Sequence, residues 1–117
     1  MAYDPQNVFA RILRGELPSD RVYEDDEFIA FRDIRPAAPM HVLVVPRGEA
    51  PASTVGLTDA DAAWVGRMML VGSRVAREAG LDARGYRLVL NAGDDAGQEV
   101  PHLHLHVLGG GALGPIA

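Results

Sequence analysis

The segment spanning residues 102–108 alternates histidine with apolar residues, and it constrains the fold of this chain more than any other feature. It contains His102, His104 and His106, which are three of the four histidines in the protein. Because successive side chains of a β-strand point to opposite faces, this two-residue period predicts a strand that carries all three imidazoles on one face. We expect the other face, made of Leu103, Leu105 and Val107, to pack in the core while the histidine face performs chemistry.

The rest of the chain predicts two helices and four further strands around this segment. A capping Asp4, Pro5 in the first turn and Gly15 at the exit indicate a short N-terminal helix. Thr58 and Asp61 resemble a capping box that opens a long helix ending at Gly80. The expected strands are 21–24, 28–33, 41–45, 86–91 and 102–108, of which 41–45 is apolar enough for a central strand.

These elements predict an α+β fold with a five-stranded antiparallel sheet, one short N-terminal helix and one long helix, all within a single domain over residues 1–117. Hairpin-length connections favour helices on one side of the sheet. The chain has no cysteine and lacks an apolar run of the roughly 20 residues that a membrane span needs. Its first residues lack the pattern of a secretory signal. We therefore expect a soluble, cytoplasmic protein with no membrane partner.

The charged residues exclude several classes of function. A net charge of −5 argues against nucleic acid as a partner, since nonspecific binding requires many basic side chains to neutralise phosphates. All 11 basic residues are arginines. Without lysine the chain can form neither a P-loop nor a Schiff base, and without cysteine it has no thiol nucleophile. Histidine, carboxylate and hydroxyl chemistry remain.

The clustered histidines have three interpretations. They could line a solvated sheet face, although three groups that titrate near neutrality would repel one another when protonated. All three cannot bind one ion, because the outer pair lies ~13 Å apart on a strand. Two neighbouring histidines could share a structural zinc ion, with His41 or Asp94 completing the site. Alternatively, a neutral imidazole could attack phosphorus if one ring nitrogen donates to a fixed acceptor. Backbone N–H groups at Gly97 and Gln98 could then hold the anion.

The chain resembles the histidine triad (HIT) family. The resemblance rests on the alternation at 102–108, on residues 31–46, and on residues 85–93 with Gly97 and Gln98, and it covers about residues 7–110. The ending at 107–110 resembles the HINT branch, the histidine triad nucleotide-binding proteins. This resemblance implies a hydrolase that acts on purine nucleoside phosphoramidates or related adenylates, with AMP-like or GMP-like nucleotides as ligands and no metal or dissociable cofactor.

The resemblance also implies a role for each site residue. His104 would be the nucleophile and form a nucleotidyl-histidine intermediate, with His102 fixing its orientation. His106 and His41 would complete a hydrogen-bonded network and help protonate the leaving group. Asp33 would bind the ribose hydroxyls. The α-phosphate would be held by Asn91, Gly97, Gln98 and the backbone at Glu99, and the purine pocket would be lined by Val8, Phe9, Ile12, Phe31 and Ile34.

Two positions depart from better-known members of the family. Glu99 stands where those members have serine beside the leaving group, so this carboxylate is either turned away from the phosphate or acts as an acid. The tail from Gly111 to Ala117 has no aromatic residue. The resemblance further implies a homodimer formed through the long helix and the strand at 86–91. The alternative function is a nucleotide-binding or protein-interaction module whose hydrolysis is incidental.

Overall fold

The computed structural model describes residues 1–48 and 50–116. Two α-helices and five β-strands form the fold, with four short 3₁₀ turns between them. The helices are α1 (Val8–Leu13) and α2 (Ala62–Glu78). The strands are β1 (Arg21–Glu24), β2 (Phe28–Arg32), β3 (Met40–Pro46), β4 (Tyr86–Val89) and β5 (Leu105–Gly109). No described helix combines the length and the apolar character needed to cross a membrane.

The strands form one antiparallel sheet in the order β1-β2-β3-β5-β4, as predicted for the fold class. The central strand is β3, which is almost completely buried. It pairs with β5 so that Leu43 lies opposite His106 and His41 lies opposite Leu108. Because alternate residues share a face, His41 and His106 are diagonal neighbours on the same face of the sheet.

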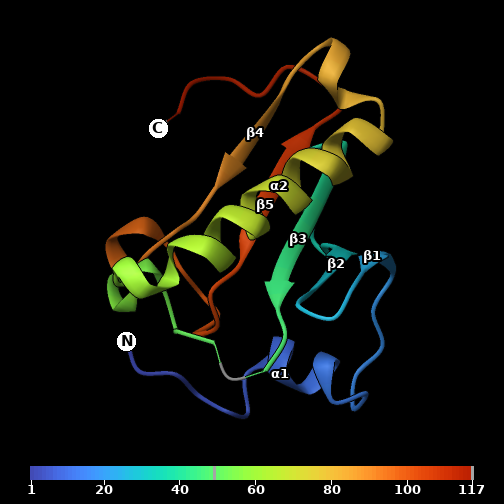
Figure 1. The fold of residues 1–117 in the computed structure, drawn as a ribbon. Coiled ribbons are helices and arrows are strands. Elements are labelled where there is room, and N and C mark those ends of the chain that lie inside the picture. The colour runs from blue at the N-terminus through green and yellow to red at the C-terminus, as the bar shows by residue number, and fades with distance from the viewer. Residues whose placement is uncertain (49, 117) are drawn as a thin grey trace.

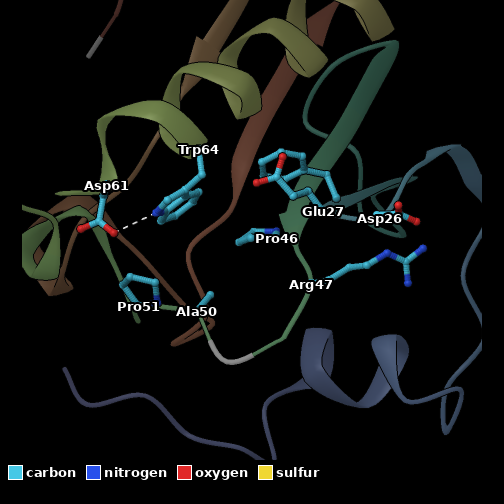
Figure 2. A pocket seen from close by; sticks show the side chains of 9 residues that line it. Asp26, Glu27, Pro46, Arg47, Ala50, Pro51, Asp61 and Trp64 are labelled. Carbon is cyan, nitrogen blue, oxygen red and sulfur yellow. Dashed lines mark hydrogen bonds between the residues drawn. The ribbon is translucent and has the colours of Figure 1, made fainter. Parts of the chain in front are cut away.

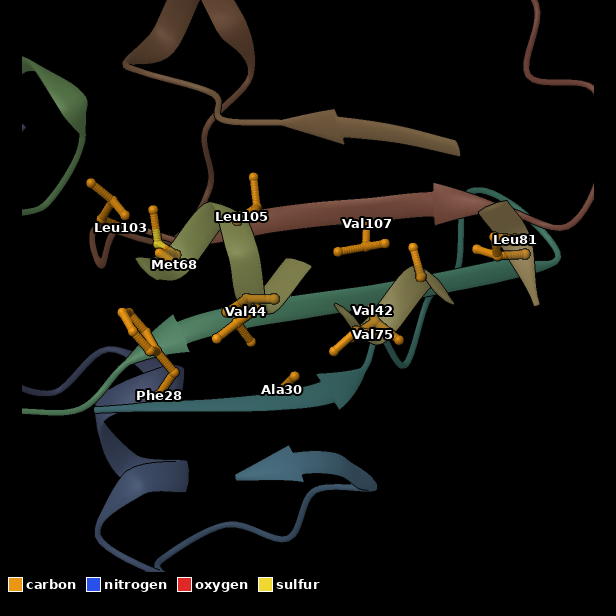
Figure 3. Close-up of a cluster of buried hydrophobic side chains, with 12 residues drawn as sticks. Phe28, Ala30, Val42, Val44, Met68, Val75, Leu81, Leu103, Leu105 and Val107 are labelled. Carbon is orange, nitrogen blue, oxygen red and sulfur yellow. The ribbon is translucent and has the colours of Figure 1, made fainter. Parts of the chain in front are cut away.

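One face of the sheet packs against α2, which crosses it in Figure 1. Figure 3 shows Leu105 and Val107 of β5 in one layer with Val44 of β3 and Met68 of α2. Leu103 joins the same cluster, so the three apolar residues of the alternating segment all pack in the core, as expected. The side chains that alternate with them, those of the histidines, must therefore lie away from α2.

The opposite face packs against α1. Phe9 and Ile12 of this helix form a second buried cluster with Ile29, Phe31 and Leu43 of the sheet. The expectation that both helices lie on one side was wrong, because β2 and β3 are buried on both faces and each face needs its own cover. The histidine face is thereby the face that α1 covers in part.

The start of α1 also differs from the prediction. Asn7 caps the helix by accepting the Ala10 N–H at 2.9 Å, whereas Asp4 was expected in that position. The Asp4 side chain instead accepts the Gln6 N–H at 2.9 Å, which closes a separate turn ahead of the helix. At the other helix, Thr58 and Asp61 do form the predicted capping box.

The final strand begins three residues later than predicted. In the register of β3 and β5, Leu103 would lie opposite Pro46, which has no N–H to donate. The Leu103 N–H donates instead to the Pro51 carbonyl at 2.9 Å. His102 and His104 therefore belong to a segment leading into β5, and only His106 lies within the strand. The strand predicted at 86–91 likewise ends early, at Val89.

The close approach of α2 to the sheet generates a stability prediction. A Cβ atom on Gly72 would lie 2.7 Å from Leu105 Cδ2 and 3.4 Å from Leu88 Cδ2, whereas one on Gly66 would meet nothing within 4 Å. Gly66→Ala should raise the free energy of unfolding by about 1 kcal/mol through helix propensity. The free energy of unfolding of Gly72→Ala should be lower than that of Gly66→Ala by more than about 1 kcal/mol, because the new methyl group forces buried side chains to move. Urea denaturation of both variants measures the difference, and equal gains would contradict the packing.

Candidate active site

His104 lies at the centre of the histidine cluster, between Phe9 of α1 and His106 of β5. Both neighbouring rings have their centroids 4.9 Å from that of His104. The His104 Nδ1–H donates to the backbone carbonyl of His102 at 2.7 Å. Because a carbonyl oxygen only accepts, the proton of neutral His104 must sit on Nδ1. Its Nε2 makes no hydrogen bond to any described residue, so this lone pair is available for attack.

His41 and His106 form a directed pair beside this ring. The Ala37 N–H donates to His41 Nδ1 at 3.0 Å, so the proton of neutral His41 must sit on Nε2. This nitrogen lies 2.8 Å from His106 Nδ1, which must then be the acceptor. The proton of His106 is left on its Nε2, a buried atom with no partner among the described residues. A buried N–H without an acceptor is costly, which indicates that an acceptor outside the protein, either water or a bound group, belongs there.

The histidines of the cluster are held neutral. Burial lowers the pKa of His41, His102 and His104 below the ordinary histidine value, and the Asp33 carboxylate opposes this only in part at His41 and His104. Burial, with smaller contributions from His104 and His41, lowers the pKa of His106 to about 4. Hydrogen-bond order has the same effect, since a second proton on His41 would face the Ala37 N–H.

Asp33, His41 and His106 are the one described group of potential metal ligands, with ligand atoms within 4.8 Å of one another. Asp94, considered above as a zinc ligand, is exposed in a separate turn. A histidine that binds metal through one nitrogen carries its proton on the other and donates it. A metal bound to His41 Nε2 would move the ring proton to Nδ1. That Nδ1–H would then point at the Ala37 N–H, and two donors would face each other. This donor set does not fit a metal ion.

His102 differs from the other histidines because its ring is fully buried and fully bonded. Its Nε2 donates to the Pro46 carbonyl at 3.0 Å. Its Nδ1 faces Tyr3 Oη at 3.2 Å and Asn7 Nδ2 at 3.3 Å. The ring thus makes only intramolecular contacts, and His102 reaches His104 through its main-chain carbonyl.

The loop after β4 uses most of its own polar groups. The N–H of Gly97 donates to Asp94 O at 2.9 Å, and that of Gln98 donates to Gly93 O at 3.1 Å. Gly97 has a positive φ of 75°, which favours glycine there. The Glu99 N–H makes no hydrogen bond to a described residue. Of the backbone donors named for the phosphate, it is therefore the one still available.

The side chains of this loop divide in the same way. Gln98 is buried; its Oε1 accepts the Gly93 N–H at 2.9 Å and its Nε2 donates to Ala52 O at 2.6 Å. It holds the loop in place. The half-buried Asn91 has no hydrogen-bond partner among the described residues, and Glu99 is exposed with no ion pair to a described residue. The exposure of Glu99 favours a carboxylate turned toward solvent over a buried acid.

The residues expected around the nucleoside are placed unequally. Phe9, Ile12 and Phe31 are buried in the α1 cluster, whereas Val8 is 41% exposed and Ile34 is 92% exposed. Asp33 Oδ2 lies 3.6 Å from His41 Nε2, at the edge of the histidine cluster. A ligand that contacted both Val8 and Ile34 would cover their exposed apolar surface.

The described hollows of the surface lie elsewhere. Figure 2 shows one of about 290 Å³ between α2 and the end of β3, where Trp64 donates to Asp61 and Arg47 lies on the opposite wall. Another, of about 510 Å³, lies between the N-terminal segment and α1. Neither is lined by a histidine of the cluster. His104 is 7% exposed, so only a small part of its ring reaches the surface.

Sequence reasoning missed four groups that order the site. They are the main-chain N–H of Ala37, the carbonyl of Pro46, the hydroxyl of Tyr3 and the amide of Asn7. The two main-chain groups leave no signal in residue types. Asn7 carried a detectable signal, because a cap residue directly before the apolar run 8–13 competes with Asp4 for the helix start.

Known proteins resemble this chain in sequence and in fold. The sequence matches the HIT domain over residues 14–113. It is 50% identical to an uncharacterized HIT-like protein of Azospirillum brasilense, covering 97% of this chain and 93% of that protein. It is 43% identical to the purine nucleoside phosphoramidase of Escherichia coli (strain K12), covering 95% and 92%. A histidine triad protein from Clostridium difficile superposes with a TM-score of 0.88 at 42% identity, covering 94% and 95%.

The neutral histidines generate a pH prediction for stability. Because their pKa values are lower in the folded protein than in the unfolded chain, the unfolded chain binds more protons in acid. The free energy of unfolding should therefore fall as pH drops from about 6.5, the ordinary histidine value, to about 4, the value for His106. Chemical denaturation across this range measures the loss. His106→Gln, which cannot titrate, should lose less, and an equal loss would contradict the assignment.

Proposed function

The chain belongs to the HIT domain family, and on that premise we propose that it hydrolyses purine nucleoside phosphoramidates or related adenylates through a nucleotidyl-histidine at His104. The observation that carries this proposal is the Nδ1–H of His104 bonded at 2.7 Å to the His102 carbonyl, which leaves Nε2 as a nucleophile. The name of the 43% identical relative from Escherichia coli supports the substrate class.

The first half of the reaction transfers the nucleotide to the protein. The lone pair of His104 Nε2 forms a bond to the α-phosphorus while the bond from phosphorus to the leaving nitrogen breaks. The leaving amine takes a proton from a solvent water molecule, which becomes hydroxide and is neutralised in bulk solvent. To supply that proton, the His41–His106 pair would first have to carry an additional proton, and it cannot do so without losing a hydrogen bond. We therefore assign the pair the role of a hydrogen-bond donor to the phosphate and not that of a proton source.

The phosphate is stabilised by neutral donors. His106 Nε2–H is a buried donor without a partner next to His104, and an oxygen of the phosphate that His104 attacks would satisfy it. Among the loop groups expected to hold the phosphate, the Glu99 N–H and the Asn91 amide make no hydrogen bond to a described residue. The side chain of Gln98 makes its hydrogen bonds within the protein, to Gly93 and Ala52, and it holds these groups in position.

The second half of the reaction releases the nucleotide. A water oxygen bonds to phosphorus and releases a proton to solvent, the bond from phosphorus to His104 Nε2 breaks, and the imidazole recovers its lone pair. Both steps use ring nitrogens of this chain and require no dissociable cofactor. The nucleoside is held by Asp33 at the ribose and by Val8, Phe9, Ile12, Phe31 and Ile34 at the purine. Binding would bury the exposed apolar surface of Ile34.

Trapping the intermediate tests the proposal. Quenching with denaturant at alkaline pH during turnover of an adenosine phosphoramidate preserves the acid-labile P–N bond, and mass spectrometry should then find a nucleotide on the peptide that contains His104. His104→Ala should lose at least about 10³-fold in kcat, because no other neutral nitrogen is positioned for attack. Full turnover by His104→Ala would contradict the mechanism. Tight AMP binding by the wild type with negligible kcat would favour a nucleotide-binding module instead.

The pH dependence of catalysis provides a second test. Burial lowers the pKa of His104, so its nucleophilic form should persist below the ordinary histidine pKa. The acidic limb of kcat/KM should therefore lie below about pH 6.5. Steady-state rates between pH 4 and 8, with stability checked at each pH, measure it. An acidic limb above pH 7 would show that a different group controls the reaction.

We further propose that the protein is a homodimer assembled through α2 and the edge strand β4. Support comes from Leu70 and Met69 of α2, which are 70% and 37% exposed, and from β4, which pairs with β5 alone. Exposed apolar side chains beside an unpaired strand edge are typical of an interface. Light scattering should give twice the chain mass, and Leu70→Glu should give the chain mass. A monomeric wild type at micromolar concentration would contradict this proposal.

A further inference from the structure

We propose that Asn7 is a positioning residue for His104, acting through His102, and that the Tyr3 hydroxyl shares this role. The inference rests on the proposed function and deepens it, because it identifies what orients the nucleophile. Neither residue belongs to the alternating segment, and both lie about 100 positions away from His102 along the chain.

The first step of the argument is the proton inventory of the His102 ring. Its Nε2 must carry the proton, because the Pro46 carbonyl at 3.0 Å can only accept. Its Nδ1 must carry a lone pair, because the Asn7 amide nitrogen at 3.3 Å can only donate. The Tyr3 hydroxyl, at 3.2 Å, can donate to the same lone pair. The ring is fully buried, so these donors and this acceptor allow a single neutral tautomer.

The second step is the transmission from His102 to His104. The Pro46 carbonyl holds the His102 ring from the end of β3, and Asn7 with Tyr3 hold it from the N-terminal segment. A ring held from two sides fixes the main chain of its own residue. The carbonyl of that residue accepts the His104 Nδ1–H at 2.7 Å. The direction of the His104 Nε2 lone pair therefore depends on the hydrogen bonds of the His102 ring.

The third step is the link to α1. The Oδ1 of Asn7 caps this helix by accepting the Ala10 N–H at 2.9 Å, while Nδ2 donates to Asp4 O at 2.7 Å and faces His102. The helix carries Phe9, whose ring packs edge-on against His104 with the centroids 4.9 Å apart. One buried amide thus joins the helix that borders the site to the residue whose carbonyl orients the nucleophile.

The charge around His102 makes this arrangement testable. Among the described titratable groups, the Tyr3 hydroxyl contacts the ring and His104 is the neighbour that acts on it when charged, and neither is a carboxylate. Burial lowers the pKa of His102, so the ring stays neutral. A carboxylate in place of the Asn7 amide would favour protonation of Nδ1, because it would accept a hydrogen bond from the Nδ1–H of the resulting imidazolium. That positive charge, one residue from His104, would disturb the nucleophile.

The test compares Asn7→Asp with Gln6→Glu in the full chain. Aspartate caps helices as well as asparagine, so α1 should keep Phe9 in place and KM should change little. In Asn7→Asp, kcat for an adenosine phosphoramidate should fall about 10-fold or more through misorientation of His104. Long-range ¹H–¹⁵N spectra should show His102 converted from the Nε2–H tautomer to the imidazolium at pH 7. The exposed Gln6→Glu adds the same charge next door and should leave both readouts at wild-type values.

Two further variants keep the inference falsifiable if Asn7→Asp does not fold. Asn7→Ser retains a capping oxygen but is too short to reach His102, and adding Tyr3→Phe removes the second donor. The double variant should lose kcat about 10-fold, with a smaller loss in Asn7→Ser alone. Wild-type kcat in the folded double variant would overturn the inference. If the wild type itself shows no turnover, the proposed function fails, and the ring spectra of His102 decide this inference independently.

Discussion

The hydrogen bond from His104 Nδ1 to the His102 carbonyl is the interaction on which the chemistry of this protein depends. At 2.7 Å it assigns the ring proton and leaves the opposite nitrogen as a lone pair. Burial reinforces this assignment by lowering the pKa of His104, so the neutral ring is retained at physiological pH. The sheet and both helices hold this donor and this acceptor in place.

The fold accomplishes this by giving the two faces of one sheet different tasks. Leu103, Leu105 and Val107 pack under α2, which anchors the segment from behind. His41 of the central strand meets His106 of β5 on the other face at 2.8 Å. A chain of hydrogen bonds runs from the Ala37 N–H through His41 to His106. It ends at His106 Nε2–H, a buried donor without a partner among the described residues. A neutral donor chain and the neutral ring of His104 thus lie side by side, and the proposed phosphate site would depend on geometry more than on positive charge.

The sequence predicted the sheet and the packing face of the alternating segment, because a two-residue period depends only on local backbone geometry. It did not predict that β5 starts at Leu105, since the Leu103 N–H donates to the Pro51 carbonyl of a distant loop. It also did not predict that α1 covers the histidine face, because the burial of both faces of β2 is a property of the assembled sheet.

At the site, the residue types were predictable but their bonding was not. Asp33, His41 and His106 lie in one cluster, and the ring of His104 packs against that of His106. The resemblance did not indicate that the ring of His102 would be consumed by Pro46, Tyr3 and Asn7. Nor did it indicate that the N–H groups of Gly97 and Gln98 would be used within their own turn. Such partners are main-chain groups or distant side chains, which carry no signal near the motif.

The most direct measurement of the central claim is the tautomer of His104 in the wild-type protein. Long-range ¹H–¹⁵N correlation spectra at pH 7 distinguish a protonated Nδ1 from a protonated Nε2 on each assigned ring. The account predicts that His104 carries its proton on Nδ1 and that Nε2 has the chemical shift of an unprotonated nitrogen. A proton on His104 Nε2, or an imidazolium at this pH, would contradict it.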